Sequence, residues 1–316
     1  MELNRNYETH PDNFYKPEII TVGRDEYTQF FIKFDNLYEI YEFLKSKHAI
    51  NTKVFSELSS VEGTYSFAGI PYEEAVEDLI DFSEEGYDDF LTLVREIATI
   101  KSGYKHEYEL RRTLAGGHLN VPAYSTGSPL CYESYERVKK PKFINIHSTL
   151  SYPWYTSKQQ VLNKAIILVS VINALEKNGY NVNLSTFELS DKYDELLYIV
   201  VNVKRFGERT NLQTLYKTNC HVEFLRRILF RVLEASAVTN NWSDGYGHTC
   251  EEKFTKKVLN IGKDDLYFGT PEELNIKGED LERDFQACLK ALDLNSKFNV
   301  AEITDEFKQK VKRLIK

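Results

Sequence analysis

The chain has 316 residues, enough to bury a sizeable core without disulfides or metal ions. Apolar residues make up 42% and charged residues 28%, which excludes a disordered, collagen-like or disulfide-framework protein. The net charge of −8 argues against wrapping nucleic acid as histones do, although an acidic mean is compatible with a local basic face.

The chain shows no segment typical of secretion or of membrane insertion. Its N-terminal stretch lacks the apolar core and small-residue cleavage site of a signal peptide. The longest apolar run, Ala165–Val171, is far shorter than the roughly 20 residues that span a bilayer. Four cysteines lie far apart without a C-x-x-C motif, so we expect reduced thiols and a cytoplasmic location.

The first part of the chain predicts a small α+β region. Residues 17–22 and 29–34 are rich in β-branched and aromatic residues and predict strands, and residues 35–47 have helical spacing. Further helices are expected after Pro71 and after Gly86. Glycines and prolines punctuate residues 104–141, which predicts mostly loop with one strand.

From residue 142 onward, strands and helices alternate. Strands are predicted at 143–147, 180–187, 196–204 and 266–268, and helices at 157–178, 212–235, 279–292 and 304–315. Gly179 is expected to end the first of these helices. The pattern predicts an α/β fold: a three-layer sheet domain over 141–316, preceded by the α+β N-terminal region over 1–140.

The familiar catalytic and nucleotide-binding motifs are absent from the sequence. There is no phosphate-binding G-x-x-x-x-G-K-[ST], no G-x-G-x-x-G, no H-E-x-x-H and no G-x-S-x-G. The seven histidines are scattered singly. We therefore predict a non-enzymatic protein without a cofactor.

The segment Ile144–Ser151, the long helix after it and residues 181–187 resemble the opening of a von Willebrand A-like domain. In that fold the first strand ends in D-x-S-x-S, which holds Mg²⁺ at the carboxyl edge of the sheet. The matching positions here are His147, Thr149 and Ser151, so the carboxylate is replaced by imidazole, a poor ligand for Mg²⁺. The resemblance implies that the domain over 141–316 is a three-layer von Willebrand A/Rossmann-like sheet domain with a degenerate site that holds no metal. A generic Rossmann-like sheet with ordinary hydroxyl residues in its loop is the alternative.

Several short segments resemble an uncharacterised family of proteins encoded by bacteriophages and related mobile elements. The segments are Gly117–Pro122, Ser125–Pro129, Asn173–Asn183 and His221–Phe230 with Glu234. The resemblance implies a phage setting in a bacterial host cell and a modified von Willebrand A-like core. It implies no established activity.

Charge is divided unevenly along the chain. Residues 71–100 hold ten acids and one arginine, whereas residues 101–175 hold ten Lys or Arg and four Glu among many aromatic residues. Cations that track phosphates and rings that stack on bases are typical of a groove for single-stranded nucleic acid. The candidate binding residues are Arg111, Arg112, Lys139, Lys140, Lys142, Tyr124, Tyr132 and Trp154, with Arg226 and Arg227 expected on the solvent side of the 212–235 helix. The rings of Tyr124, Tyr132 and Trp154 are expected to be exposed.

Two ordinary explanations stand beside this hypothesis. The basic stretch could pair with the acidic helices within the molecule, and Arg227 could pair with Glu223 one helical turn away. The sequence thus favours a phage accessory protein that binds single-stranded nucleic acid, DNA rather than RNA, in transcription or replication, with a polymerase as a candidate contact. The alternative is a metal-free protein–protein adaptor or virion-assembly factor. A hydrolase using His147 with the hydroxyl of Thr149 or Ser151 is a third hypothesis.

Overall fold

The computed structural model describes nine segments of the chain, and the structural statements below concern these residues. They are 18–46, 70–81, 87–98, 107–138, 142–177, 179–192, 194–236, 249–262 and 264–293. The final helix expected at 304–315 lies outside them.

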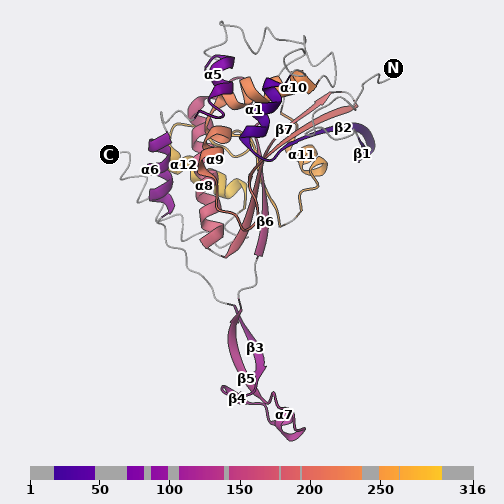
Figure 1. The fold of residues 1–316 in the computed structure, drawn as a ribbon, viewed down its shortest axis with the longest axis vertical. Helices are drawn as coiled ribbons and strands as arrows, with labels where there is room; N and C mark the ends of the chain where they lie inside the picture. Colours follow the sequence, from indigo (N-terminus) through magenta and orange to yellow (C-terminus); the bar gives the residue numbers. More distant parts are fainter. Residues whose placement is uncertain are drawn as a thin grey trace.

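A curled, mixed six-stranded sheet forms the centre of the molecule (Figure 1). Its strand order is β1-β2-β8-β7-β6-β9. The β1–β2 and β7–β8 pairs are antiparallel, whereas β2–β8, β6–β7 and β6–β9 are parallel. The strands span Glu18–Val22 (β1), Asp25–Phe34 (β2), Lys142–Thr149 (β6), Tyr180–Lys192 (β7), Glu195–Lys204 (β8) and Leu266–Phe268 (β9).

One face of this sheet carries the two largest apolar clusters. The register pairs Ile146 with Leu184 and Phe34 with Val201 on this face, because directly paired residues point to the same side. Val201 is also opposite Thr186, two residues along β7 from Leu184. Most helices cover it: Leu37–Lys45 (α1), Tyr72–Glu77 (α5), Tyr87–Ala98 (α6), Lys158–Lys177 (α8), Leu212–Cys220 (α9), the π-helix Phe224–Leu229 (η3), Phe230–Ser236 (α10) and Leu281–Ala291 (α12). Helix α8 is buried around most of its circumference, and Gly179 follows it with φ +83°, the conformation expected of a residue that ends a helix.

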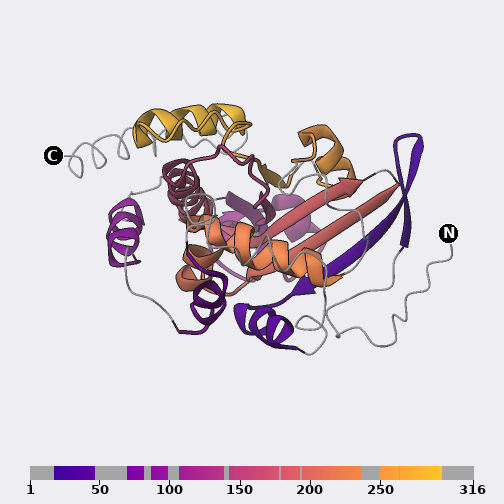
Figure 2. The ribbon, with the colours of Figure 1, turned by 90° about the horizontal axis from the view of Figure 1, so that it is seen from above.

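The opposite face is covered differently from the expected three-layer arrangement. A small cluster around Phe187, Leu189 and Tyr267 packs beside Glu252–Val258 (α11) and its flanking residues. Figure 2 shows α11 set apart from the helices α1, α5 and α10. Elsewhere on this face, Asn183 donates to Asn145, and His147 lies beside Ser185. The fold is α/β, with its helices distributed unequally over the two faces.

Residues 107–138 form an arm, where the sequence had predicted mostly loop. A three-stranded antiparallel sheet in the order β3-β5-β4 is formed by Glu107–Thr113 (β3), His118–Leu119 (β4) and Tyr132–Val138 (β5). In the chain, the short helix Val121–Ser125 (α7) connects β4 to β5. In Figure 1 this arm projects away from the six-stranded sheet. The prediction was wrong because a ribbon that packs on no core needs no alternation of apolar and polar residues, so the pattern that reveals strands is missing.

Two further predictions need correction or extension. The helix expected over 212–235 is interrupted at His221, whose extended backbone (φ −110°, ψ 122°) ends α9 before η3 begins. The six-stranded sheet also spans the boundary predicted at residue 140, since β1 and β2 pair into it beside β8. Within the described residues, no helix is both long and apolar enough to cross a membrane.

Candidate functional site

The carboxyl end of β6 lies where the chain changes direction across the sheet. After β6, helix α8 leads to β7 on one side, whereas β9 joins β6 on the other side much later in the chain. In open α/β sheets ligands bind outside the carboxyl ends of strands at such a switch point. This edge is therefore the first place to look for a binding site.

The three residues of the predicted degenerate metal site are engaged within the protein. Thr149 Oγ1 accepts from the backbone N–H of Ser151 at 3.1 Å, and Ser151 Oγ donates to Glu188 Oε2 at 2.6 Å. His147 Nδ1 lies 3.3 Å from Ser185 Oγ, so the histidine contacts neither hydroxyl that the hydrolase hypothesis needs. Burial lowers the pKa of His147, which favours the neutral imidazole.

A buried lysine supplies positive charge at the same edge. Lys164, from α8, donates to the main-chain carbonyl of Thr149, and its Nζ lies 5.2 Å from the ring centre of Tyr152. Burial lowers the pKa of Lys164 to about 7. The hydroxyls of Thr149 and Ser151 are already bonded within the protein, and His147 stands where the resemblance expects a carboxylate, so these residues do not fit Mg²⁺. Among the described residues, no group of three or more His, Cys, Asp or Glu is placed to hold a metal ion.

Glu188 is a second buried ionisable group beside this edge. Its two carboxyl oxygens accept from Ser151 Oγ and, at 3.2 Å, from Ser190 Oγ. Burial raises the pKa of Glu188 to about 7 in spite of these bonds, because a carboxylate removed from water is costly. The inner part of the edge is therefore a closed polar cluster with no metal-binding geometry.

The loop after β6 presents two aromatic side chains to solvent. Trp154 is 75% exposed and Tyr155 is 54% exposed, and their rings meet edge to face at 5.7 Å. Tyr155 also forms a side-chain hydrogen bond with Glu272, which raises the pKa of the tyrosine. The exposure of Trp154 was predicted from the sequence. Tyr155 had not been singled out, although it follows Trp154 directly.

Hydrogen bonds from Arg226 fix the backbone of this loop. Its guanidinium donates to the carbonyls of Trp154 at 3.2 Å and Thr156 at 3.3 Å, with a longer contact to Pro153 at 3.5 Å. The arginine itself is only 5% exposed. Arg226 thus fixes the backbone that carries Trp154, and it is not available to a ligand.

The expectation that Arg226 and Arg227 face solvent is wrong. Arg227 is 1% exposed, and its Nε donates to the carbonyl of Ile70 at 2.8 Å. Both arginines belong to η3, where i→i+5 bonding widens the turn and alters the helical spacing used in the prediction. The helix is buried on several sides, and backbone carbonyls of neighbouring segments bond the guanidinium groups.

The remaining candidate residues lie in other parts of the molecule. Arg111, Arg112 and Tyr124 are exposed on the arm, where Arg112 Nε is 3.8 Å from a carboxyl oxygen of Glu133, and Tyr132 is half-buried there. Lys142 is exposed at the start of β6, with its Nζ 5.6 Å from the ring centre of Tyr180. Lys139 and Lys140 lie outside the described residues. Because Lys142 begins β6 and Trp154 follows its end, roughly 23 Å of strand separates these two candidates.

The acidic helix α5 pairs with lysines from outside the basic stretch. Asp78 accepts from the buried Lys217, and Glu77 pairs with Lys45 at 2.5 Å. These contacts therefore give no support to internal pairing between residues 71–100 and residues 101–175.

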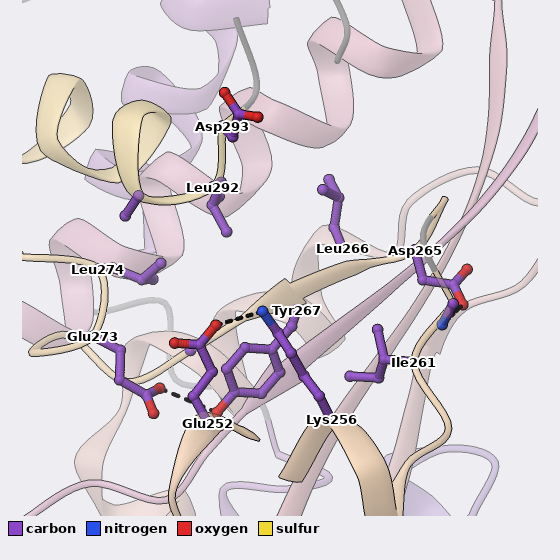
Figure 3. Close-up of a pocket in the computed structure, with 13 residues that line it drawn as sticks. Glu252, Lys256, Ile261, Asp265, Leu266, Tyr267, Glu273, Leu274, Leu292 and Asp293 are labelled. Carbon is purple, nitrogen blue, oxygen red and sulfur yellow. Dashed lines mark hydrogen bonds and ion pairs between the residues drawn. The ribbon is translucent and has the colours of Figure 1, made fainter. Parts of the chain in front are cut away.

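A pocket of about 330 Å³ lies beside β9, between α11 and α12 (Figure 3). Its charged groups are occupied by partners in the same chain: Lys256 pairs with Glu252, and Glu273 accepts from the hydroxyl of Tyr267 at 3.1 Å. Asp265 accepts from the side chain of Asn145 at 2.9 Å and from the backbone of Gly262 at 3.0 Å. The small volume and internal pairing make this pocket a weaker candidate than the Trp154 loop.

Comparison with known proteins assigns the family. The model of a domain of unknown function, DUF7192, matches residues 12–296, so the chain belongs to this family. No curated protein and no solved structure matches the chain.

Proposed function

We propose that this protein is a non-enzymatic adaptor that binds a protein partner at the carboxyl edge of its sheet, through Trp154 and Tyr155. The observation that carries the proposal is the exposed aromatic pair on a loop whose backbone is fixed by a buried arginine. A rigid tryptophan loses little conformational entropy on binding and buries a large area. Loops held by a rigid scaffold commonly carry binding residues.

The fold around the loop supports a von Willebrand A-like core used without metal. Strand β6 lies between two parallel neighbours, and the long helix α8 follows the loop, as the resemblance requires. At the position that the resemblance assigns to the metal, Lys164 and the hydroxyls of Thr149 and Ser151 make contacts within the protein. The phage setting and a virion-assembly role remain predictions from the resemblance.

Charge at this edge favours a protein over nucleic acid as the partner. Three cations of the nucleic-acid hypothesis are buried: Lys164 from the basic stretch 101–175, and the additional candidates Arg226 and Arg227. Each donates to a backbone carbonyl and cannot contact the phosphates of a bound strand. Tyr155 contacts an acidic residue, Glu272. Single-stranded nucleic acid, which also stacks on exposed rings, becomes an alternative outcome of the test.

The test places a photo-crosslinking amino acid at position 154 and, as a matched control, at position 206. Phe206 is also an exposed aromatic residue, 40% accessible, but it follows β8 in the chain. In a lysate of the organism that encodes the chain, we expect a crosslinked species from position 154 alone, sensitive to protease and resistant to nuclease. Equal yields from both positions, or a product removed by nuclease, would contradict the proposal.

The purified partner allows a quantitative test. Trp154→Ala should weaken binding about 30-fold, as expected of an interface tryptophan worth about 2 kcal/mol, and Phe206→Ala should weaken it less than about threefold. If Trp154→Ala binds as tightly as the natural protein, the exposed ring does not carry the interaction.

A further inference from the structure

Tyr155 connects the Trp154 loop to a carboxylate from a distant part of the chain. Its ring meets Trp154 edge to face, with the ring centres 5.7 Å apart, and its side chain is hydrogen-bonded to Glu272. Glu272 lies in the turn that follows β9. The two rings and this carboxylate therefore form one surface feature, which we call the aromatic-acid patch.

All three side chains of the aromatic-acid patch are open to solvent. Trp154 and Tyr155 are each more than half exposed, and Glu272 is exposed as well. At this exposure the indole of Trp154 presents a ring face to solvent. The face of an aromatic ring carries partial negative charge, because the π electrons lie above and below the ring plane. The patch is therefore electrically negative toward a ligand, both at its rings and at its carboxylate.

The backbone is fixed on both sides of the patch. Arg226 bonds the carbonyls of Trp154 and Thr156 on one side. On the other side, main-chain hydrogen bonds of 2.7–3.1 Å close the turn over residues 270–276, which carries Glu272. Groups whose backbone is already held lose less conformational entropy when they bind. The patch is thus arranged for binding before a ligand arrives.

Within the part of the chain that the structure describes, no lysine, arginine or histidine forms an ion pair with Glu272. Lys158, which begins α8 shortly after the loop, acts on Glu223 and helps to lower the pKa of that carboxyl. Arg226 is buried and donates to backbone carbonyls. Among the described residues, the cations nearest in sequence to the Trp154 loop or bonded to it thus serve other groups.

A guanidinium group matches the chemistry of this patch. Its plane stacks on an aromatic face, where the cation is attracted by the ring, and its parallel N–H donors fit a carboxylate. A carboxylate offers about four lone-pair sites, so Glu272 can accept further bonds beside the one from Tyr155. An apolar side chain would remove water from Glu272 without replacing it, which is costly, and a phosphate would be repelled.

We propose, building on the proposed function, that the aromatic-acid patch binds an arginine side chain of the protein partner. The guanidinium lies on the ring of Trp154 and contacts the carboxylate of Glu272. Because this contact is at the solvent-exposed surface, it selects the partner more than it adds affinity, and it weakens as salt is added.

A peptide probe tests the contact without an identified partner. The probe is an acetylated, amidated peptide of alternating glycine and arginine, and its control carries citrulline, which has the shape of arginine without the charge. In ¹H–¹⁵N spectra of the full chain, the arginine peptide should shift the indole signal of Trp154, assigned with Trp154→Phe, with a dissociation constant on the order of a millimolar. The citrulline peptide should bind at least about threefold more weakly.

Substitutions in the patch separate the charge from the ring. Glu272→Gln should weaken binding of the arginine peptide about three- to fivefold, whereas Glu26→Gln, at an exposed position on β2 towards the opposite edge of the sheet, should leave it unchanged. Trp154→Leu keeps an apolar side chain but loses the π face, and Trp154→Phe keeps one. Followed through the backbone amide of Tyr155, Trp154→Leu should weaken binding more than Trp154→Phe.

Three results would overturn the arginine contact: equal binding of the two peptides, an unchanged affinity of Glu272→Gln, or equal effects of the leucine and phenylalanine variants at position 154. A thymidine oligonucleotide of about 15 nucleotides that binds at Trp154 more tightly than the arginine peptide would do the same.

The adaptor role and the arginine contact can fail separately. If a protein crosslinks at position 154 and binds Glu272→Gln as tightly as the natural chain, the adaptor role stands and the arginine contact is wrong. If the arginine peptide binds through Glu272 but no protein crosslinks at position 154, the patch is an arginine site and the adaptor role is wrong.

Discussion

Glu188→Gln should stabilise the protein at alkaline pH and leave its stability nearly unchanged in acid. Glu188 is 1% exposed, and its pKa is raised from 4.5 to about 7 by burial. Between these two values the unfolded chain releases a proton that the folded chain retains, so stability falls as pH rises through this window. The gap of about 2.5 pH units corresponds to roughly 3 kcal/mol, since one pKa unit is about 1.36 kcal/mol.

Glutamine removes the ionisation while keeping an oxygen that can accept from Ser151 Oγ. We expect the free energies of unfolding of the natural protein and Glu188→Gln to agree within about 0.5 kcal/mol at pH 4.5, and the variant to be more stable by about 3 kcal/mol at pH 8.

Urea denaturation from pH 4.5 to 8, followed by circular dichroism, measures this difference. Glu251→Gln, at an exposed position, is the matched control and should show no such divergence. If Glu188→Gln and the natural protein lose stability in parallel over this range, Glu188 is not the group whose proton uptake is linked to folding.

Two other variants test buried cations. Burial lowers the pKa of Lys164 to about 7, so from pH 7 to 9 the unfolded lysine alone keeps its proton, and the natural protein should gain about 2 kcal/mol of stability. In urea denaturation, Lys164→Met should not show this gain. A gain of the same size in the variant would contradict the assignment. Arg227→Met removes a buried guanidinium and leaves the Ile70 carbonyl without its 2.8 Å donor, so it should lower the free energy of unfolding by about 2–4 kcal/mol. The control Arg209→Met, at an exposed position, should change this free energy by less than about 0.5 kcal/mol. Equal effects of the two variants would argue against a structural role for Arg227.

The elements that the sequence predicted well are those buried around β6. The helix expected at 157–178 is α8, Lys158–Lys177, because its long apolar run ends at a glycine that takes a positive φ. The strand expected at 266–268 is β9, which is buried at every position. Where burial dominates, apolar patterns indicate structure directly.

The features that escaped prediction depend on contacts between distant parts of the chain. Arg226 and Arg227 look like surface residues until the carbonyls of Trp154 and Ile70 are brought to them by other segments. The arm escaped because strands without a buried face carry no apolar alternation. Of the three rings expected to be exposed, Tyr124 and Trp154 are exposed, whereas Tyr132 is half-buried, so that part of the prediction was wrong. The single-stranded nucleic-acid hypothesis assumed that residues near in sequence converge in space, and the structure instead distributes them between the arm, the start of β6 and the carboxyl edge.

The parallel pairing of β2 with β8 has a consequence for synthesis of the chain on the ribosome. Phe30, Ile32 and Phe34 are buried against Leu197, Ile199 and Val201, which are translated more than 160 residues later. At about 5–20 residues per second, the N-terminal strand waits on the order of 10–30 s for its neighbour. During that interval the apolar side chains of β2 are exposed and can aggregate. Chaperones that hold nascent chains should therefore bind β2 until translation has passed residue 204.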